Sequence, residues 1–123
     1  MSNYAYVATR ARSRRSRLLP AEAYNQLLNL EHAEIARYIQ DLEYRREIDR
    51  YGSTLSGADL IETALVDNLA KDVGDFLSFS KGKLRDILHV YAEKYRIENL
   101  KNIVRGINQN MDKQNLELSL IHI

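Results

Sequence analysis

The chain contains no cysteine and no tryptophan, and it has only one proline and five glycines among its 123 residues. The absence of cysteine excludes disulfide bonds, thiolate nucleophiles and cysteine-ligated zinc sites, and it suits a reducing compartment. Proline and glycine most often interrupt regular structure, so their scarcity leaves little material for turns. No apolar run approaches the 18 residues of a membrane-spanning helix. We therefore expect one nearly all-helical domain.

The sequence also lacks the short motifs that bind nucleotides or catalytic metals. It contains no G-x-x-x-x-G-K-[ST] phosphate loop, no G-x-G-x-x-G and no H-E-x-x-H. The histidines His32 and His89 are interpreted as helix-surface residues. The carboxylates between Glu43 and Asp49 alternate with arginines at a spacing typical of a salt-bridged surface. The sequence therefore predicts no catalytic site, no cofactor and no bound metal.

Apolar residues recur at helical spacing in six segments, and no segment alternates as a strand would. The expected helices cover residues 4–18, 20–30, 35–42, 43–51, 59–77 and 84–105. Pro20 is predicted as the first residue of the second helix. Ser56 and Asp59 match a capping box at the start of the fifth. The predicted fold class is all-α, with the helices arranged like a bundle.

The last two segments carry the longest apolar stripes. The stripe of residues 60–77 runs over about five turns, and residues 84–95 present a matching face. Because the connection between them is short, we expect an antiparallel hairpin with Ser80 as the N-cap of its second helix. Past Tyr95 the stripe rotates, which predicts either one long bent helix or two helices meeting near residues 96–98. Gly106, directly after Arg105, predicts the end of the last helix.

Positive charge gathers near one end of a chain whose formal net charge is only +1. Residues 1–19 contain five arginines and no acid, whereas the remaining 13 basic and 17 acidic residues leave the rest at −4. These arginines are Arg10, Arg12, Arg14, Arg15 and Arg17. They predict a surface that contacts an acidic partner, either a protein or lipid headgroups.

The alternative interpretation is a small helical nucleic-acid-binding module that uses the same arginines. We do not expect nucleic acid, because the rest of the chain is net acidic and no docking motif is present. A salt titration against oligonucleotides separates the two hypotheses, since phosphate contacts make affinity steeply dependent on salt.

Four stretches resemble the first repeat of the central-stalk connector of rotary ATPases, known as the C subunit in the archaeal A-type enzyme and the d subunit in the vacuolar V-type enzyme. The stretches are N-Y-A-Y-V-A-T-R-A-R at residues 3–12, L-L-P-A-E-A-Y-N-Q-L-L at 18–28, E-Y-R-R-E-I-D at 43–49 and Y-R-I-E-N-L-K-N-I-V-R-G at 95–106. Their order and spacing agree over residues 3–106. Two departures concern charge: Arg96 stands where the family often has an acid, and residues 12–17 are unusually rich in arginine.

The resemblance implies one of three helical repeats of a funnel-shaped protein that has no catalytic residues or cofactor. Such a connector lies on the cytoplasmic face of the membrane as a peripheral protein. It joins the rotor ring of the membrane sector to the central shaft, and it transmits torque between proton or sodium translocation and ATP chemistry.

We also expect the chain to be a fragment. Residues 1–107 correspond to the repeat, and residues 108–123, which end in L-S-L-I-H-I, are expected to be a non-native or disordered tail. In a repeat array each unit buries part of its apolar surface against its neighbours. The side chains expected to remain exposed for that reason are Ile97, Leu100, Ile103, Val104 and Ile107.

Overall fold

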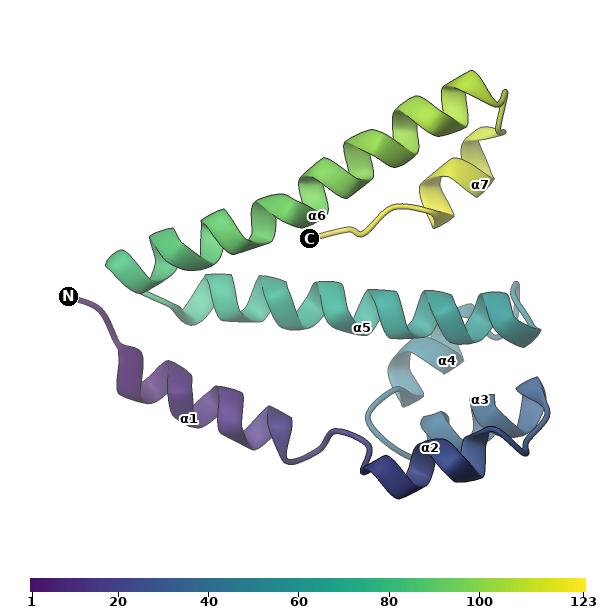
Figure 1. Ribbon diagram of the computed structural model, residues 1–123, viewed down its shortest axis with the longest axis horizontal. Coiled ribbons are helices and arrows are strands. Elements are labelled where there is room, and N and C mark those ends of the chain that lie inside the picture. The colour runs from purple at the N-terminus through teal and green to yellow at the C-terminus, as the bar shows by residue number, and fades with distance from the viewer. The chain divides into compact units, whose positions relative to one another are not determined.

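The computed structural model describes all 123 residues, Met1–Ile123. It contains seven α-helices and no strand (Figure 1). The helices are α1 (Tyr4–Arg15), α2 (Ala21–Leu27), α3 (His32–Gln40), α4 (Arg45–Tyr51), α5 (Gly57–Phe79), α6 (Lys83–Asn108) and α7 (Lys113–Leu118). The all-α prediction is confirmed, and all six expected helices are present with shifted ends.

The chain divides into two compact units. One unit is Ala8–Asn68, called here the 8–68 unit. The other joins Met1–Val7 to Leu69–Ile123, and it is called here the 69–123 unit. The chain therefore passes from one unit to the other within α1 and again within α5.

The core of the 8–68 unit lies where α3, α4 and the first half of α5 meet. Its buried residues are Ala36, Ile39, Ile48, Leu60 and Ala64. Ala64 has no exposed surface, and α3 and α4 are in close contact. Small side chains allow this approach, because alanine adds little bulk between helix backbones. Partly buried tyrosines surround the core, as expected for rings that keep one polar end near water.

The predicted hairpin of α5 and α6 exists at its turn but not along its length. The close helix contact of the 69–123 unit is between α6 and α7, not between α5 and α6. A cavity of about 260 Å³ lies between Val73 and Phe76 of α5 and Leu88 of α6. Ile87 and Val90 of α6 are 54% and 74% exposed. The prediction of matched packing was wrong because a short connection fixes only where two helices meet, not the angle between them.

Residues from the start of the chain contact the turn between α5 and α6. The side chain of Asn3 bridges the turn, because its Nδ2 donates to the Phe79 carbonyl at 2.8 Å and its Oδ1 accepts from the Lys81 N–H at 2.9 Å. Gly82 precedes α6 with a φ of 59°, and a Cβ there would lie 2.9 Å from Ser2 Oγ. Tyr6 packs edge-on against Phe79, with ring centroids 5.9 Å apart.

Two expected helix starts differ from the sequence interpretation. Gly82, not Ser80, is the N-cap of α6, since Ser80 is buried and its Oγ donates to the Phe76 carbonyl at the end of α5. Pro20 is the N-cap of α2 and has extended backbone, so it lies one position before the first helical residue.

The helix α6 is continuous, so the single-helix alternative is the one observed. Its 26 residues span about 39 Å. Gly106 does not end it. Asn110 takes the left-handed conformation instead, with a φ of 54°. The N–H groups of Asn110 and Met111 donate to the carbonyls of Ile107 and Gly106, which is the hydrogen-bond pattern of a Schellman cap.

Gly106 has a different role from the predicted one. It is buried inside α6, and a Cβ at this position would lie 2.6 Å from Leu116 Cδ1 of α7. The missing side chain therefore lets α7 lie close against α6, as Figure 1 shows. A glycine that admits a neighbouring helix has the same sequence signature as one that ends a helix.

Residues 108–123 contain α7 and are bonded back to α6. Asn99 Nδ2 donates to the Ile121 carbonyl at 2.7 Å, and Asn99 Oδ1 accepts from the Ile121 N–H at 2.8 Å. Asn102 Nδ2 donates to the Ser119 carbonyl at 3.0 Å. All of these residues belong to the 69–123 unit. The predicted domain boundary at residue 107 stays a prediction. The assignment of residues 108–123 as non-native stays a prediction.

Replacing Asn99 with alanine should loosen the end of the chain. Asn99→Ala removes both bonds to Ile121, each worth about 1 kcal/mol. The Ile121 amide should then exchange with solvent roughly tenfold faster, which is measured by NMR hydrogen exchange. Asn102→Ala, which removes one exposed bond, is the matched control and should have a smaller effect at Ile121. Unchanged exchange at Ile121 in Asn99→Ala would contradict this account.

Replacing Asn3 should destabilise the turn between α5 and α6. Asn3→Ala removes two bonds to backbone groups more than 75 residues away in sequence, and we expect a loss of about 1–2 kcal/mol in unfolding free energy. Urea unfolding followed by circular dichroism measures it. Asn29→Ala removes only a local, exposed bond to the Asn25 carbonyl and serves as the control. Equal losses in the two variants would show that Asn3 does not hold the turn.

Candidate partner-contact surfaces

The prominent surface features of the structure are a cluster of arginines and two exposed apolar surfaces. No three His, Asp or Glu side chains come together in an arrangement that would hold a metal ion. None of the seven helices combines the length and the apolar composition needed to cross a membrane. His32 and His89 are exposed, in agreement with the sequence interpretation.

The predicted arginine cluster lies at the end of α1 and just beyond it. Arg14 is half-buried, and the other four arginines are exposed. Three of the five, Arg12, Arg14 and Arg15, lie in the last turn of α1. The carbonyl end of a helix carries partial negative charge, which favours cations at this position. Three of the five arginines thus share one helical turn, and the role of the cluster as a contact surface stays a prediction.

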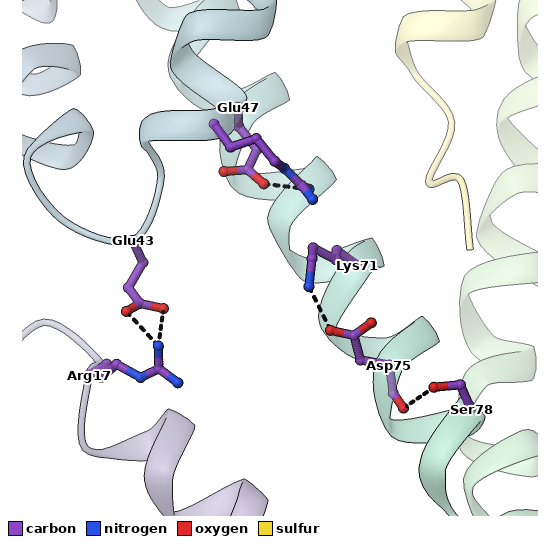
Figure 2. A network of polar contacts seen from close by, with 7 residues as sticks. Arg17, Glu43, Glu47, Lys71, Asp75 and Ser78 are labelled. Carbon is purple, nitrogen blue, oxygen red and sulfur yellow. Dashed lines mark hydrogen bonds and ion pairs between the residues drawn. The ribbon is translucent and has the colours of Figure 1, made fainter.

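Arg17, the last member of the cluster, forms an ion pair with Glu43. Its Nη1 lies 3.0 Å from Oε1 and 3.3 Å from Oε2 of Glu43 (Figure 2). Both side chains are substantially exposed, so the pair contributes no more than about 1 kcal/mol to stability. Its effect is geometric, because it ties the segment after α1 to the segment before α4.

An apolar groove lies in the 8–68 unit. It has a volume of about 390 Å³, and its lining includes Leu19, Tyr24, Leu28, Ile35 and Tyr44. Leu28 is 82% exposed and Tyr24 is 57% exposed, so the groove is open to solvent. The sequence did not predict this groove. A stripe of leucine and tyrosine along a helix has the pattern of a buried core face, and the sequence does not show whether another element covers it.

A second apolar surface runs along α6 and is called here the α6 stripe. Ile97, Leu100, Val104 and Ile107 are all more than half exposed. Ile103, the fifth residue of the predicted stripe, is half-buried. The predicted exposure is therefore confirmed for four of the five side chains.

A cation lies against two aromatic rings nearer the middle of α6. Lys94 Nζ donates to the Tyr91 hydroxyl at 2.6 Å and lies 3.9 Å from the centroid of that ring. The hydrogen bond to Lys94 lowers the pKa of Tyr91, and the same bond raises the pKa of Lys94. Burial is the main cause that raises the pKa of Tyr95. The sequence interpretation includes Tyr91 in the apolar face of residues 84–95. In the structure its side chain is 53% exposed and its hydroxyl is bonded to Lys94.

Glu47 is the one carboxylate of the charged helix that the sequence misplaces. Its side chain is only 1% exposed, although the alternating charges predict a solvated surface. Glu47 Oε1 lies 2.7 Å from Arg46 Nη2, an ion pair that Figure 2 shows, whereas Oε2 has no hydrogen-bond partner.

Comparison with known proteins places the chain in a family. It is similar to the C subunit of the A-type ATP synthase of Haloferax volcanii, with 41% identity over 98% of this chain and 34% of that protein. The protein of the same name from Methanosarcina mazei is 40% identical over 98% of the chain and 33% of its own length. The protein of the same name from Halobacterium salinarum is 36% identical over 98% of this chain and 34% of its own length. The chain thus spans about a third of the length of these relatives.

No solved structure matches the chain. The family described as ATP synthase (C/AC39) subunit matches residues 7–123, a range that includes α7. The resemblance found in four stretches of sequence is therefore confirmed over nearly the whole chain. On this similarity, the chain belongs to the ATP synthase (C/AC39) subunit family.

Proposed function

We propose that the chain serves as part of the connector of an A-type rotary ATP synthase. In this role it joins the rotor ring of the membrane sector to the central shaft and transmits torque between proton or sodium translocation and ATP chemistry. The observation that carries the proposal is the similarity of 98% of the chain to proteins named as the C subunit of the A-type ATP synthase. The connector acts without catalytic residues, at the cytoplasmic face of the membrane.

The two long helices support a mechanical role. The helices α5 and α6 contain 23 and 26 residues without a break. Every interior peptide group of an α-helix is hydrogen-bonded along the axis, so such a helix transmits force with little deformation. Asn3 and the residues around it fix the turn between them.

The exposed apolar and basic surfaces support a role as one subunit of a larger assembly. The α6 stripe leaves several large apolar side chains in water, and contiguous apolar patches usually mark contact sites. The proposal assigns this stripe to an interface within the assembled enzyme. The arginine cluster, Arg10, Arg12, Arg14, Arg15 and Arg17, is assigned to an acidic face of a neighbouring protein of the complex.

A chimera tests the proposal directly. This chain would replace the matching segment of the C subunit in Methanosarcina mazei, and the control chimera would carry the same segment from Methanosarcina acetivorans, whose C subunit is 41% identical to this chain. We expect both chimeras to assemble and to drive ATP-dependent ion pumping into inverted membrane vesicles. ATP hydrolysis and ion pumping are measured on the same vesicles. A connector that cannot transmit torque would allow ATP hydrolysis without ion pumping.

The proposal fails if the control chimera pumps while the chimera with this chain either does not assemble or hydrolyses ATP without pumping. Such a result would mean that family membership does not extend to the coupling role.

A further inference from the structure

We propose that the α6 stripe packs against a helix of another subunit, and that this partner helix has acidic residues on both sides of its own apolar face. The inference rests on the proposed function, which assigns the stripe to an interface within the assembled enzyme. It adds the chemistry of the partner, which follows from the order of apolar and charged side chains along α6.

The exposed side chains of the stripe have the spacing of a coiled-coil contact. Ile97, Leu100, Val104 and Ile107 follow one another at intervals of three, four and three residues. In a seven-residue repeat with positions a to g, this is the spacing of alternating a and d positions. Ile97 and Val104 then lie at a, where β-branched residues favour a contact between two helices, and Leu100 lies at d. The stripe is therefore suited to pack against one further helix over about three turns.

The segment at the end of the chain lies on the opposite side of α6. Asn99 and Gly106 are at position c and Asn102 is at position f, and these positions point away from a and d because successive helix residues are about 100° apart. All three lie against residues 116–121. The four side chains at a and d stay between 53% and 67% exposed, so α7 does not cover them. The stripe is thus open to a further helix.

The positions beside the stripe carry cations and no acid. When two helices pack through a and d, the e and g positions of one helix face the e and g positions of the other. Between residues 94 and 108 these positions are Lys94, Arg96, Lys101, Ile103 and Asn108. The three cations are exposed. Glutamates at e and g of a partner helix would therefore be attracted, and lysines would be repelled.

Two of these cations have glutamate partners within α6, but the pairs do not cancel the charge of the helix. Arg96 Nη1 lies 2.8 Å from Glu93 Oε1, and Lys101 Nζ lies 3.0 Å from Glu98 Oε1. All four side chains are about half exposed or more, so each pair contributes less than about 1 kcal/mol and can give way to a contact with a partner. Lys94 bonds to a tyrosine hydroxyl instead. With six basic and three acidic residues, α6 has a net charge of +3.

The same charges disfavour a second copy of this chain as the partner. In a parallel pair each g residue faces the e residue of the following repeat, so Arg96 would face the second copy's Lys101. In an antiparallel pair e faces e and g faces g, which again brings cations together. Like charges that face each other across an interface weaken it. The stripe therefore selects a different helix with acidic flanks.

The binding test uses the complete 123-residue chain and labelled helical peptides. The probe peptide has about 21 residues, with isoleucine at a, leucine at d and glutamate at e and g. In the control peptide lysine replaces each glutamate. Fluorescence anisotropy should show that the glutamate peptide binds at least about tenfold more tightly at low salt, and added salt should reduce the difference.

A substitution within the stripe shows whether the peptide binds there. Leu100→Glu places a carboxylate among the apolar side chains of the stripe. Leu28→Glu makes the same change in the 8–68 unit, at a side chain that is 82% exposed. Leu100→Glu should weaken binding of the glutamate peptide at least about tenfold, whereas Leu28→Glu should leave it unchanged.

A charge reversal shows whether the e and g positions select the partner. Arg96→Glu combined with Lys101→Glu should reverse the preference, so that the lysine peptide binds more tightly than the glutamate peptide. The control, Arg85→Glu combined with Arg105→Glu, makes the same change in net charge at two exposed residues of α6 that lie outside e and g. It should keep the preference for glutamate. Circular dichroism checks that every variant remains folded.

A crosslink in the assembled chimera identifies the source of the partner helix. A photoreactive benzoylphenylalanine replaces Val104, whose side chain is 59% exposed at position a. Mass spectrometry should find the crosslink on another subunit, in a helix with glutamate or aspartate at its e and g positions. A crosslink to the remainder of the Methanosarcina mazei C subunit would overturn the assignment to another subunit.

Three results of the peptide experiments would overturn the inference. They are equal affinity for the two peptides, unchanged binding in Leu100→Glu, and the same preference in both charge-reversal variants. Self-association of the unmodified chain that Leu100→Glu abolishes, measured by analytical ultracentrifugation, would overturn it in favour of a second copy. The peptide measurements need no assembled enzyme, so failure of this inference and failure of the chimera are distinguishable.

Discussion

The structure depends on one constraint, which is that the chain has too few side chains to cover two long amphipathic helices. Burial of apolar surface supplies about 25 cal/mol for each Å², and a helix gains this only where a neighbour covers it. In the 8–68 unit three helices converge, so Ile39 and Leu60 become buried. In the 69–123 unit the close neighbour of α6 is the six-residue helix α7, which leaves Leu100 and Val104 in water. The helix α6 therefore packs against α7 on one side and leaves a row of apolar side chains exposed on another.

Side-chain hydrogen bonds to the backbone join distant segments of the unit that contains α6. Asn99 fastens the end of the chain to α6, and Asn3 fastens the start of the chain to the turn between α5 and α6. Each asparagine side chain bonds both a backbone donor and a backbone acceptor, because an amide carries an oxygen that accepts and an NH₂ that donates. Such bonds contribute modestly to stability but define geometry closely, which suits an element that must present a fixed surface.

The sequence predicted the helices well because helical periodicity is a local property that survives whatever the neighbours do. It did not predict how they pair, because the same apolar stripe serves a core, a groove or an exposed interface. Gly106 and Glu47 show the limit most clearly. A glycine near the end of a stripe looks like a cap, and a glutamate among arginines looks solvated, yet both are buried by helices that the local pattern does not reveal. The arginine cluster was found from charge alone, whereas the apolar groove requires three helices to be placed.

The central claim is that the exposed stripe of α6 is an interface of the assembled enzyme. Hydrogen exchange followed by mass spectrometry tests this most directly, by comparing residues 97–107 in the isolated chain and in the assembled chimera. Amides of a helix exchange more slowly when its exposed face is covered, because local opening then exposes more apolar surface. The account predicts slower exchange in residues 97–107 on assembly, with little change around the already buried Ile39. Equal exchange of residues 97–107 in the two states would contradict it.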